Sequence, residues 1–548
     1  MVRGHAATRP AAGVSVCPRG RTPGVRWPRL AVLAVAAVAG GCATLRSDYP
    51  RTASSALPPQ FDGASGRYVR SEVESHPGQC GFRLLSSGTD ALMSRVWLID
   101  HARHSIDLQY FIFANDATGR LIAQRLLAAA DRGVRVRLLL DDISLAHEDR
   151  LLGALGAHPN IEVRVFNPFR TRDPSWPSKL VQLALEGPRL NRRMHNKSLV
   201  VDGFVAVLGG RNIGDAYFDA GDDNNFRDLD VLTIGPAVIE TAQAFDAYWN
   251  SNAAWPLGAF RTTRNASADL ATVRPELKGA VRAFAQSDYA QAVLEELPNG
   301  ATGDRPGRWV WGEATLLADQ PQKIEVRDDE PALRIGPKVK QAMDGAGSEL
   351  LLISPYFVPS RAGVRYLTAL ARRGVAVRVL TNSLASTDDP AAEAGYAHAR
   401  RELLAGGVEL YELQPSGGPR PRHTDPSRSS GVSLHAKAIV VDRRVVFVGS
   451  MNLDPRSKLL NTEMGVLADC PQLAGEVAHF FEQAADSYHA FRVRLERHGA
   501  PSSTTGGHLE WSWDDHGTLL SSRDEPEVSA TRRLEFDLAR LLPIEALL

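Results

Sequence analysis

Two stretches of this sequence decide its fold, and they share one pattern. Residues 194–202 read MHNKSLVVD and residues 209–212 read GGRN. Residues 434–442 read LHAKAIVVD and residues 449–452 read GSMN. Both fit the spacing H-x-K-x4-D-x6-G-[GS]-x-N. A lone H-x-K triplet would mean little, whereas two copies with the same internal spacing indicate a duplicated unit.

The pattern suits phosphate chemistry. A β-branched run follows each histidine and predicts a strand, in which residues two apart lie on one face, so His195 and Lys197, or His435 and Lys437, project together. After a turn, a second apolar strand returns toward the histidine. It ends at the small residues Gly210 and Ser450, which allow close approach to an anion, and at Asn212 and Asn452. Lysine and asparagine supply donors for phosphoryl oxygens.

The motif aspartates have a different role. Seven positions separate Asp202 from His195, which is about 23 Å along a strand at about 3.3 Å per residue. We therefore predict that Asp202 and Asp442 fix the turns. Aligning the two halves places Asp228 over Glu463, and these carboxylates are our candidates for orienting the histidine rings. Asp230 is the second choice in the first half.

The rest of the chain supports a duplication. Residues 131–138 (DRGVRVRL) match residues 372–379 (RRGVAVRV), and each follows a β-rich run and a helical stretch. Strand, helix and strand in series predict α/β units with helices flanking a sheet. We expect a first lobe over 79–255, an irregular connector with helical pieces over 256–330, and a second lobe over 331–495. A C-terminal extension over 496–548 carries Leu534, Leu538 and Leu541 at helical spacing, which favours packing on the core over a membrane-surface role.

The N-terminus reads as a targeting segment. Arginines precede the apolar run 30–39, which is too short to span a bilayer, and Gly40, Gly41 and Cys42 follow. This order is typical of a signal peptide. Cys42 resembles the lipidated cysteine of bacterial lipoproteins, the alternative being an ordinary secretory signal. Residues 43–78, rich in Ser, Pro and Gly, read as a flexible tether. The predicted location is the bacterial cell envelope, lipid-anchored and facing the periplasm, with the inner or outer membrane left open.

The cysteines and the charge balance restrict the other possibilities. Cys80 and Cys470 open the first lobe and close the second, and a disulfide between them is one hypothesis for an oxidising compartment. No CxxC or Cys/His cluster suggests zinc, and we predict neither metal nor cofactor. The chain has 63 basic and 63 acidic residues, so it lacks the overall basic field that captures nucleic acid.

The two motifs resemble those of the phospholipase D superfamily, over nearly the whole chain from about 80 to 490. More narrowly, residues 209–215 (GGRNIGD), 454–457 (DPRS) and 541–545 (LLPIE) look like the bacterial cardiolipin synthase C branch. The resemblance implies duplicated α/β/α sandwich lobes with one active site at the lobe interface and no obligate oligomer. It also implies a metal-independent transfer in which His195 attacks phosphorus and His435 serves as general acid, then base.

The resemblance further implies a reaction and its lipids. A phosphatidyl group would be transferred to phosphatidylglycerol to make cardiolipin, with phosphatidylethanolamine as a further possible substrate. Three alternatives stay open: a hydrolytic phospholipase D that releases phosphatidic acid, a phosphodiesterase or nuclease, and an inactive envelope binding protein. The intact motifs disfavour the last, and the neutral charge disfavours the nuclease.

Overall fold

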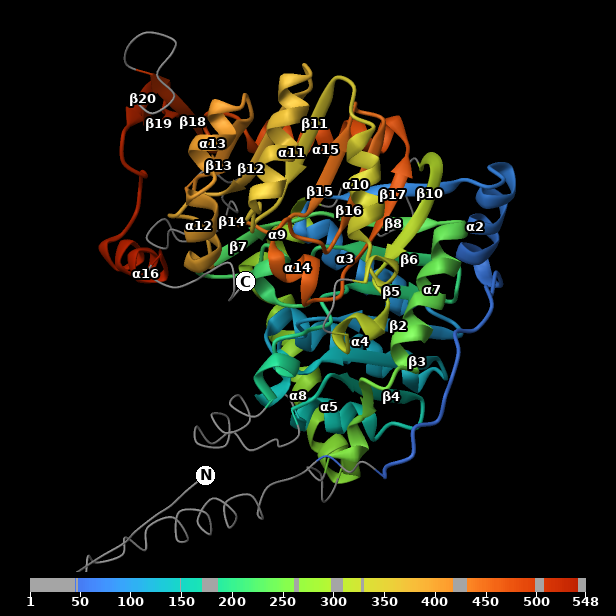
Figure 1. Ribbon diagram of the computed structural model, residues 1–548. Coiled ribbons are helices and arrows are strands. Elements are labelled where there is room, and N and C mark those ends of the chain that lie inside the picture. The colour runs from blue at the N-terminus through green and yellow to red at the C-terminus, as the bar shows by residue number, and fades with distance from the viewer. Residues whose placement is uncertain are drawn as a thin grey trace, which may run out of the picture.

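The computed structural model describes residues 45, 48–147, 149–169, 186–260, 266–296, 309–326, 330–416, 431–497 and 507–540. Two similar lobes are stacked against each other, the first below and the second above in Figure 1. Each is a mixed sheet with helices on both faces. The predicted fold class is therefore correct.

The first lobe has three parallel strands at its centre, β2, β3 and β4, with β5, β6, β8 and β1 continuing the sheet in antiparallel pairs. Helices α3, α4 and α5 cover one face and α7 the other. The elements are β1 (Cys80–Leu85), α3 (Gly88–His101), β2 (Ser105–Tyr110), α4 (Ala117–Asp131), β3 (Arg135–Asp141), α5 (Asp149–Gly156), β4 (Ile161–Phe166), β5 (Ser198–Val201), β6 (Val205–Gly209), β8 (Asp230–Ile234), α7 (Pro236–Trp249) and β9 (Ala254–Pro256).

The second lobe repeats this order. Helices α10, α11 and α13 lie on one face of its sheet and α15 on the other. The elements are β10 (Val310–Ala318), α10 (Gly336–Asp344), β11 (Glu349–Ile353), α11 (Arg361–Arg372), β12 (Ala376–Asn382), α13 (Arg400–Ala405), β13 (Glu409–Leu413), β15 (Ala438–Val441), β16 (Val445–Gly449), β17 (Met464–Asp469), α15 (Pro471–Ala484) and β18 (Ala490–Arg497). After α4 and α11 the chain turns at Gly133 and Gly374, whose φ angles of 93° and 96° favour glycine.

Strand β10 joins the two sheets, because its first residues pair with β1 and the remainder pairs with β17. The described strands thus form one 18-stranded sheet that runs through both lobes. The predicted connector is corrected here, since its residues 310–318 are a strand of the second lobe. The rest of that region includes helices α8 (Ala266–Ala285) and α9 (Asp288–Glu296), and α8 packs against α4 and α5.

A second, two-stranded sheet also links the lobes. Strand β7 (Asn224–Arg227) of the first lobe pairs in parallel with β14 (Gly431–Leu434) of the second, directly before His435. In the equivalent place before the first histidine, Met194, the residue directly before His195, forms an isolated parallel bridge with Thr462 of the second lobe. Each histidine is therefore fixed by backbone pairing with the other lobe.

The predicted flexible tether is wrong for most of its length. The backbone N–H of Ala56 donates to the Asp246 carboxylate at 2.8 Å, and Gln60 donates to the Asp202 carbonyl at 2.9 Å. Helix α2 (Gly63–Ser75) follows, and the Phe61 ring stacks on Phe204 with centroids 5.6 Å apart. The Ser- and Pro-rich composition concealed a segment whose backbone bonds to side chains of the first lobe.

The predicted Cys80–Cys470 disulfide is also wrong, since both are free, buried thiols. Strand β10 lies between them: Cys80 is paired with Gly312, and Asp469, next to Cys470, is paired with Glu313. Two strand spacings separate the cysteines by about 9–10 Å, more than the roughly 7 Å between Cα atoms that a disulfide spans. The Ala237 N–H donates to the Cys80 sulfur, and the Cys470 thiol donates to the Trp311 carbonyl.

The C-terminal region is a hairpin and a helix. Strands β19 (Gly507–Asp515) and β20 (Thr518–Ser522) extend the second sheet beyond β18, and α16 (Ala530–Arg540) lies against α12 (Pro390–Ala397). The helix packs on the second lobe as predicted, but through Phe536, which is buried, rather than through Leu534 and Leu538, which are 60% and 56% exposed. Leu541 lies outside the described residues.

Candidate active site

The two motif histidines lie at the lobe interface, held in place by both lobes. The His195 N–H donates to the Thr462 carbonyl at 2.9 Å, and the His435 N–H donates to the Arg227 carbonyl at 2.8 Å. Both side chains are almost fully buried. The strands that follow, β5 and β15, are central in their sheets, so the backbone around both rings is rigid.

Each imidazole bonds to a carboxylate of the opposite lobe. His195 Nδ1 donates to Glu463 Oε2 at 2.9 Å, and His435 Nδ1 donates to Asp228 Oδ2 at 2.6 Å. A neutral imidazole protonated at Nδ1 carries its lone pair on Nε2. The carboxylates thus select the tautomer in which Nε2 is free for chemistry. Asp230, the second choice, instead pairs with Arg95 and Arg211.

Gly210 and Ser450, the residues after each motif glycine, contact these carboxylates, and their predicted binding of phosphate stays a prediction. A Cβ at Gly210 would lie 2.2 Å from Asp228 Oδ1, so only glycine leaves room for that carboxylate. At the equivalent position, the Ser450 hydroxyl donates to Glu463 Oε2 at 2.5 Å and accepts from the Met464 N–H. The Ser450 carbonyl also accepts from His195 Nδ1 at 3.1 Å.

The two asparagines differ. The Asn212 amide oxygen accepts from the Ile112 N–H at 3.2 Å, whereas the buried amide oxygen of Asn452 has no partner. The lysines reach back toward the histidines, since Lys197 Nζ donates to the His195 carbonyl at 2.7 Å and Lys437 Nζ donates to the His435 carbonyl. Both ammonium groups are buried near the carboxylates of Glu463 and Asp228, and an anionic phosphoryl group would add further negative charge beside them.

The motif aspartates lie at the far ends of their strands. The Asp202 carboxylate accepts from the N–H groups of Arg103, His104 and Ser105. The Asp442 carboxylate does the same for Gly347, Ser348 and Glu349, which holds its pKa at about 2 against the opposing effect of burial. Both aspartates thereby fix the turn after the motif strand to the start of a neighbouring strand, away from the histidines.

Several residues support the site without having been predicted. The Ser457 hydroxyl donates to Glu463 Oε1 at 2.7 Å, and the Asp319 carboxylate accepts from the Glu463 N–H at 2.8 Å. Phe111 packs edge-on against His195, and Tyr217 packs edge-on against His435. Ser457 belongs to the DPRS segment at residues 454–457, whose family resemblance could have identified it as a site residue. Asp319 falls in the assumed connector, where no sequence pattern pointed to it.

Burial dominates the electrostatics of the site. It lowers the pKa of His195 to about 4 and, together with Lys437, the pKa of His435 to about 3. Burial also lowers the pKa of Lys437 to about 8 and that of Lys197 well below its usual value. Burial would raise the pKa of Glu463, but His195 and Lys197 hold it below the usual value. Burial and the neighbouring charges therefore favour neutral imidazoles, ionised carboxylates and weakly held ammonium protons.

No group of three or more His, Cys, Asp or Glu side chains suited to a metal ion occurs in the described part of the chain. The arrangement combines two imidazoles whose Nε2 atoms are left for chemistry with two lysines, all of them buried. It can bind one phosphoryl group between two imidazoles, one to attack phosphorus and one to exchange a proton.

Comparisons with known proteins agree. The family model "Cardiolipin synthase, PLD-like domain" matches residues 96–249 and 339–485, one match in each lobe. The chain is 40% identical to "Cardiolipin synthase C" of Escherichia coli over 91% of this chain and 100% of that protein. It is 24% identical to "Cardiolipin synthase" of Staphylococcus aureus over 73% of this chain and 66% of that one.

Solved structures show the same fold. Phosphatidylserine synthase of Haemophilus influenzae superposes with a TM-score of 0.52 over 88% of this chain and 99% of that one, at 14% identity. The duplicated lobes and the shared site define an enzyme of the phospholipase D superfamily. Within it, the chain belongs to the cardiolipin synthase-like family with the PLD-like domain.

The pKa values predict the pH dependence of the free enzyme. We expect kcat/KM on a soluble phosphodiester such as bis(4-nitrophenyl) phosphate to fall below about pH 4, where His195 becomes protonated and loses its lone pair. It should also fall above about pH 8, where Lys437 loses the charge that binds phosphate. Lys437→Arg, which stays charged, should move the alkaline decline upward. A wild-type kcat/KM that still rises at pH 9 would contradict this assignment.

Proposed function

We propose that this enzyme transfers a phosphatidyl group through a phosphohistidine to the glycerol head group of phosphatidylglycerol, making cardiolipin. The observation that carries the proposal is the pair of crossed imidazole–carboxylate contacts, His195 with Glu463 and His435 with Asp228, in a buried site. The likeness to Cardiolipin synthase C of Escherichia coli supports the choice of lipid.

The proposed reaction has two balanced steps. His195 Nε2 attacks phosphorus and forms a P–N bond, while the P–O bond to the leaving alcohol breaks and His435 Nε2 gives that oxygen a proton. Then His435 takes the proton of the incoming hydroxyl, whose oxygen attacks phosphorus and displaces His195. Lys197 and Lys437 neutralise charge on the phosphoryl oxygens in both transition states. The anion that enters the site raises the low imidazole pKa values, which allows His435 to hold its proton beside Asp228.

Transfer and hydrolysis share the first step and differ in what attacks the phosphohistidine. Both imidazoles and both lysines are buried, and a site that excludes water favours a bound lipid alcohol over water. Hydrolytic release of phosphatidic acid is the second candidate. The equal numbers of acidic and basic residues continue to disfavour nucleic acid as the substrate.

Mass spectrometry can separate the histidine roles. In the His435→Ala variant, a substrate with an activated leaving group should still react and should leave a stable adduct on His195, because no base remains to activate the acceptor. The His195→Ala variant should form no adduct. An adduct on His435 in that variant would reverse the roles.

The lipid products can separate transfer from hydrolysis. With wild-type enzyme and phosphatidylglycerol vesicles, alone or with phosphatidylethanolamine, cardiolipin should appear. Phosphatidic acid as the sole product would establish a hydrolase.

We also propose that Cys42 carries a lipid that anchors the enzyme in the bacterial envelope, facing the periplasm. Cys42 lies outside the described residues, and no described helix has the length and apolar character needed to cross a bilayer. From Arg51 onward the chain is bonded along the first lobe, so an anchor at Cys42 would keep that lobe near the membrane.

Cell fractionation of a Cys42→Ser variant tests the anchor. The substitution should move the protein to the soluble fraction or leave it unprocessed. Retention on membranes with unchanged mature size would refute the anchor.

A further inference from the structure

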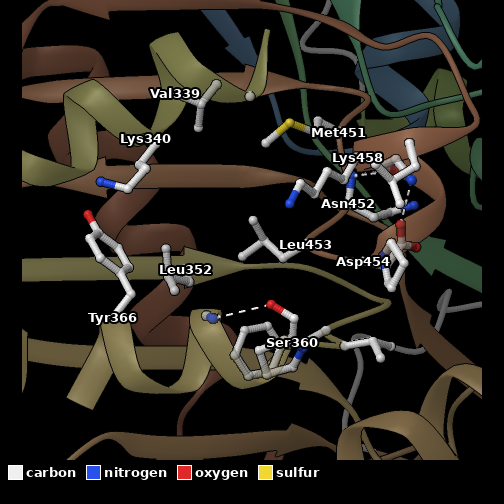
Figure 2. A pocket seen from close by; sticks show the side chains of 18 of the residues that line it. Val339, Lys340, Leu352, Ser360, Tyr366, Met451, Asn452, Leu453, Asp454 and Lys458 are labelled. Carbon is white, nitrogen blue, oxygen red and sulfur yellow. Dashed lines mark hydrogen bonds between the residues drawn. The ribbon is translucent and has the colours of Figure 1, made fainter. Parts of the chain in front are cut away.

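The second lobe contains a cavity of about 1550 Å³, larger than the roughly 300–1,000 Å³ typical of ligand pockets. It lies between α10, α11 and the segment that carries Asn452 and helix α14 (Pro455–Leu459), as Figure 2 shows. Its body is apolar, with Met343, Leu352, Phe357 and Leu367 among the lining side chains. Its size and lining are suited to a long apolar ligand.

The first lobe provides an internal control, because the same space is filled there. Asp202 binds the N–H groups of residues 103–105, and Asp442 binds those of residues 347–349 in the same way, so these two stretches are equivalent. Extending this alignment along the chain matches α3 and β2 with α10 and β11. Arg95 then corresponds to Val339, and Tyr110 corresponds to Ser354. Arg95 is buried and donates to the Tyr110 hydroxyl at 3.0 Å. In the second lobe two much smaller side chains stand in their place.

The paired helices show the same difference. Their C-terminal turns at Gly133 and Gly374 align α4 with α11, so the fully buried Ile122 corresponds to Gly363, which lines the cavity. Helix α3 packs along α4, whereas α10 and α11 touch through Lys340 and Tyr366, and both of these residues line the cavity. Between β10 and α10, where the first lobe has only a short turn, Asp319, Lys323, Pro331, Arg334 and Ile335 form a further wall. Among the described residues, the side chains that fill the equivalent space of the first lobe are thus replaced by smaller ones at the cavity wall.

At its polar end the cavity lies one contact away from the carboxylate that holds His195. Asn452, Asp454 and Ser457 line it there, and the Ser457 hydroxyl bonds to Glu463, the carboxylate that holds His195. The Asn452 side chain is 5% exposed, and its amide oxygen has no partner, unlike that of Asn212. An unpaired buried acceptor is costly unless a ligand supplies a donor. The rim carries the exposed cations Arg361 and Lys458, which complement anionic head groups, whereas Lys340 is paired with Asp344 at 2.8 Å.

We infer that this cavity binds an acyl chain of the phospholipid whose polar part lies at His195. The inference rests on the proposed function for the identity of the substrate. An acyl chain fits an apolar cavity that ends at polar groups beside the reacting histidine, and its burial would contribute affinity in proportion to chain length. The second lobe would thus select long-chain lipids, while the histidines perform the same chemistry on any accessible phosphodiester.

Filling the cavity tests this directly. The Gly363→Ile variant restores the residue of the first lobe, and Gly363→Phe fills more of the space; a Cβ at Gly363 meets only Pro359 Cβ at 3.3 Å and Ser360 Oγ at 3.8 Å. We expect Gly363→Phe to lower kcat/KM for dioleoyl phosphatidylglycerol at least tenfold. Its kcat/KM for bis(4-nitrophenyl) phosphate, which has no acyl chain, should stay within twofold of the wild type. Gly279→Ile, at an open position of helix α8, is the matched control and should change neither.

Binding is measured separately from turnover. A phosphatidylglycerol with a diazirine on its acyl chain, in vesicles, should label Met343, Leu352 or Leu367 after illumination of wild-type enzyme, and labelling should be lost in Gly363→Phe. Labelling elsewhere, or an unchanged preference for long-chain lipid in Gly363→Phe, would overturn the inference. If wild-type enzyme turns over no lipid but the cavity is still labelled, the proposed function fails and the acyl-chain site stands.

Discussion

The crossed contact between each imidazole and the carboxylate of the opposite lobe is the interaction on which the rest of this structure depends. His195 precedes strand β5 of its own lobe but is held by Glu463 of the other lobe, and His435 precedes β15 but is held by Asp228. Neither lobe alone contains a complete histidine–carboxylate pair. The two lobes must therefore stay in fixed register, which the pairing of β1 with β10 and of β7 with β14 enforces.

The same contacts make the site costly without a ligand. Two imidazoles, two ammonium groups and two carboxylates are removed from water, and burial lowers the pKa of both histidines and both lysines. A phosphodiester anion opposes this effect of burial, since its negative charge favours the protonated forms of the lysines and histidines. Binding the substrate and switching the protonation of the histidines are thus one electrostatic event.

The two lobes share a fold but differ around their carboxylates and along one helix pair. Glu463 accepts from the hydroxyl groups of Ser450 and Ser457, whereas Asp228 packs against Gly210 and accepts from the Leu229 N–H. Val339 and Gly363 line the cavity of the second lobe, where the first lobe has the larger, buried Arg95 and Ile122. The first lobe also binds residues 51–60, which lie before its first strand.

The repeated motif spacing was enough to predict the duplicated α/β lobes, the shared interface and the clustering of both histidines with both lysines. Aligning the halves also selected Asp228 over Asp230, because equivalent residues occupy equivalent places. Alignment could not reveal that each histidine bonds to the carboxylate of the opposite lobe. The two halves are equivalent in sequence, so a contact within one lobe and a contact between the lobes were equally compatible with the alignment. Composition misled for residues 50–62, whose backbone bonds to distant side chains such as Asp246. Cysteine spacing could not reveal that β10 separates Cys80 from Cys470.

The crossed imidazole–carboxylate contacts are tested most directly by replacing each carboxylate and trapping the phosphohistidine with an activated phosphodiester. If Asp228 serves His435, the Asp228→Asn variant should behave like a protein without its general acid and base, and the adduct on His195 should accumulate in the mass spectrum. The Glu463→Gln variant should form little adduct, because His195 loses the group that holds its reactive tautomer. The opposite pattern, an adduct that accumulates in Glu463→Gln and is absent in Asp228→Asn, would contradict the account.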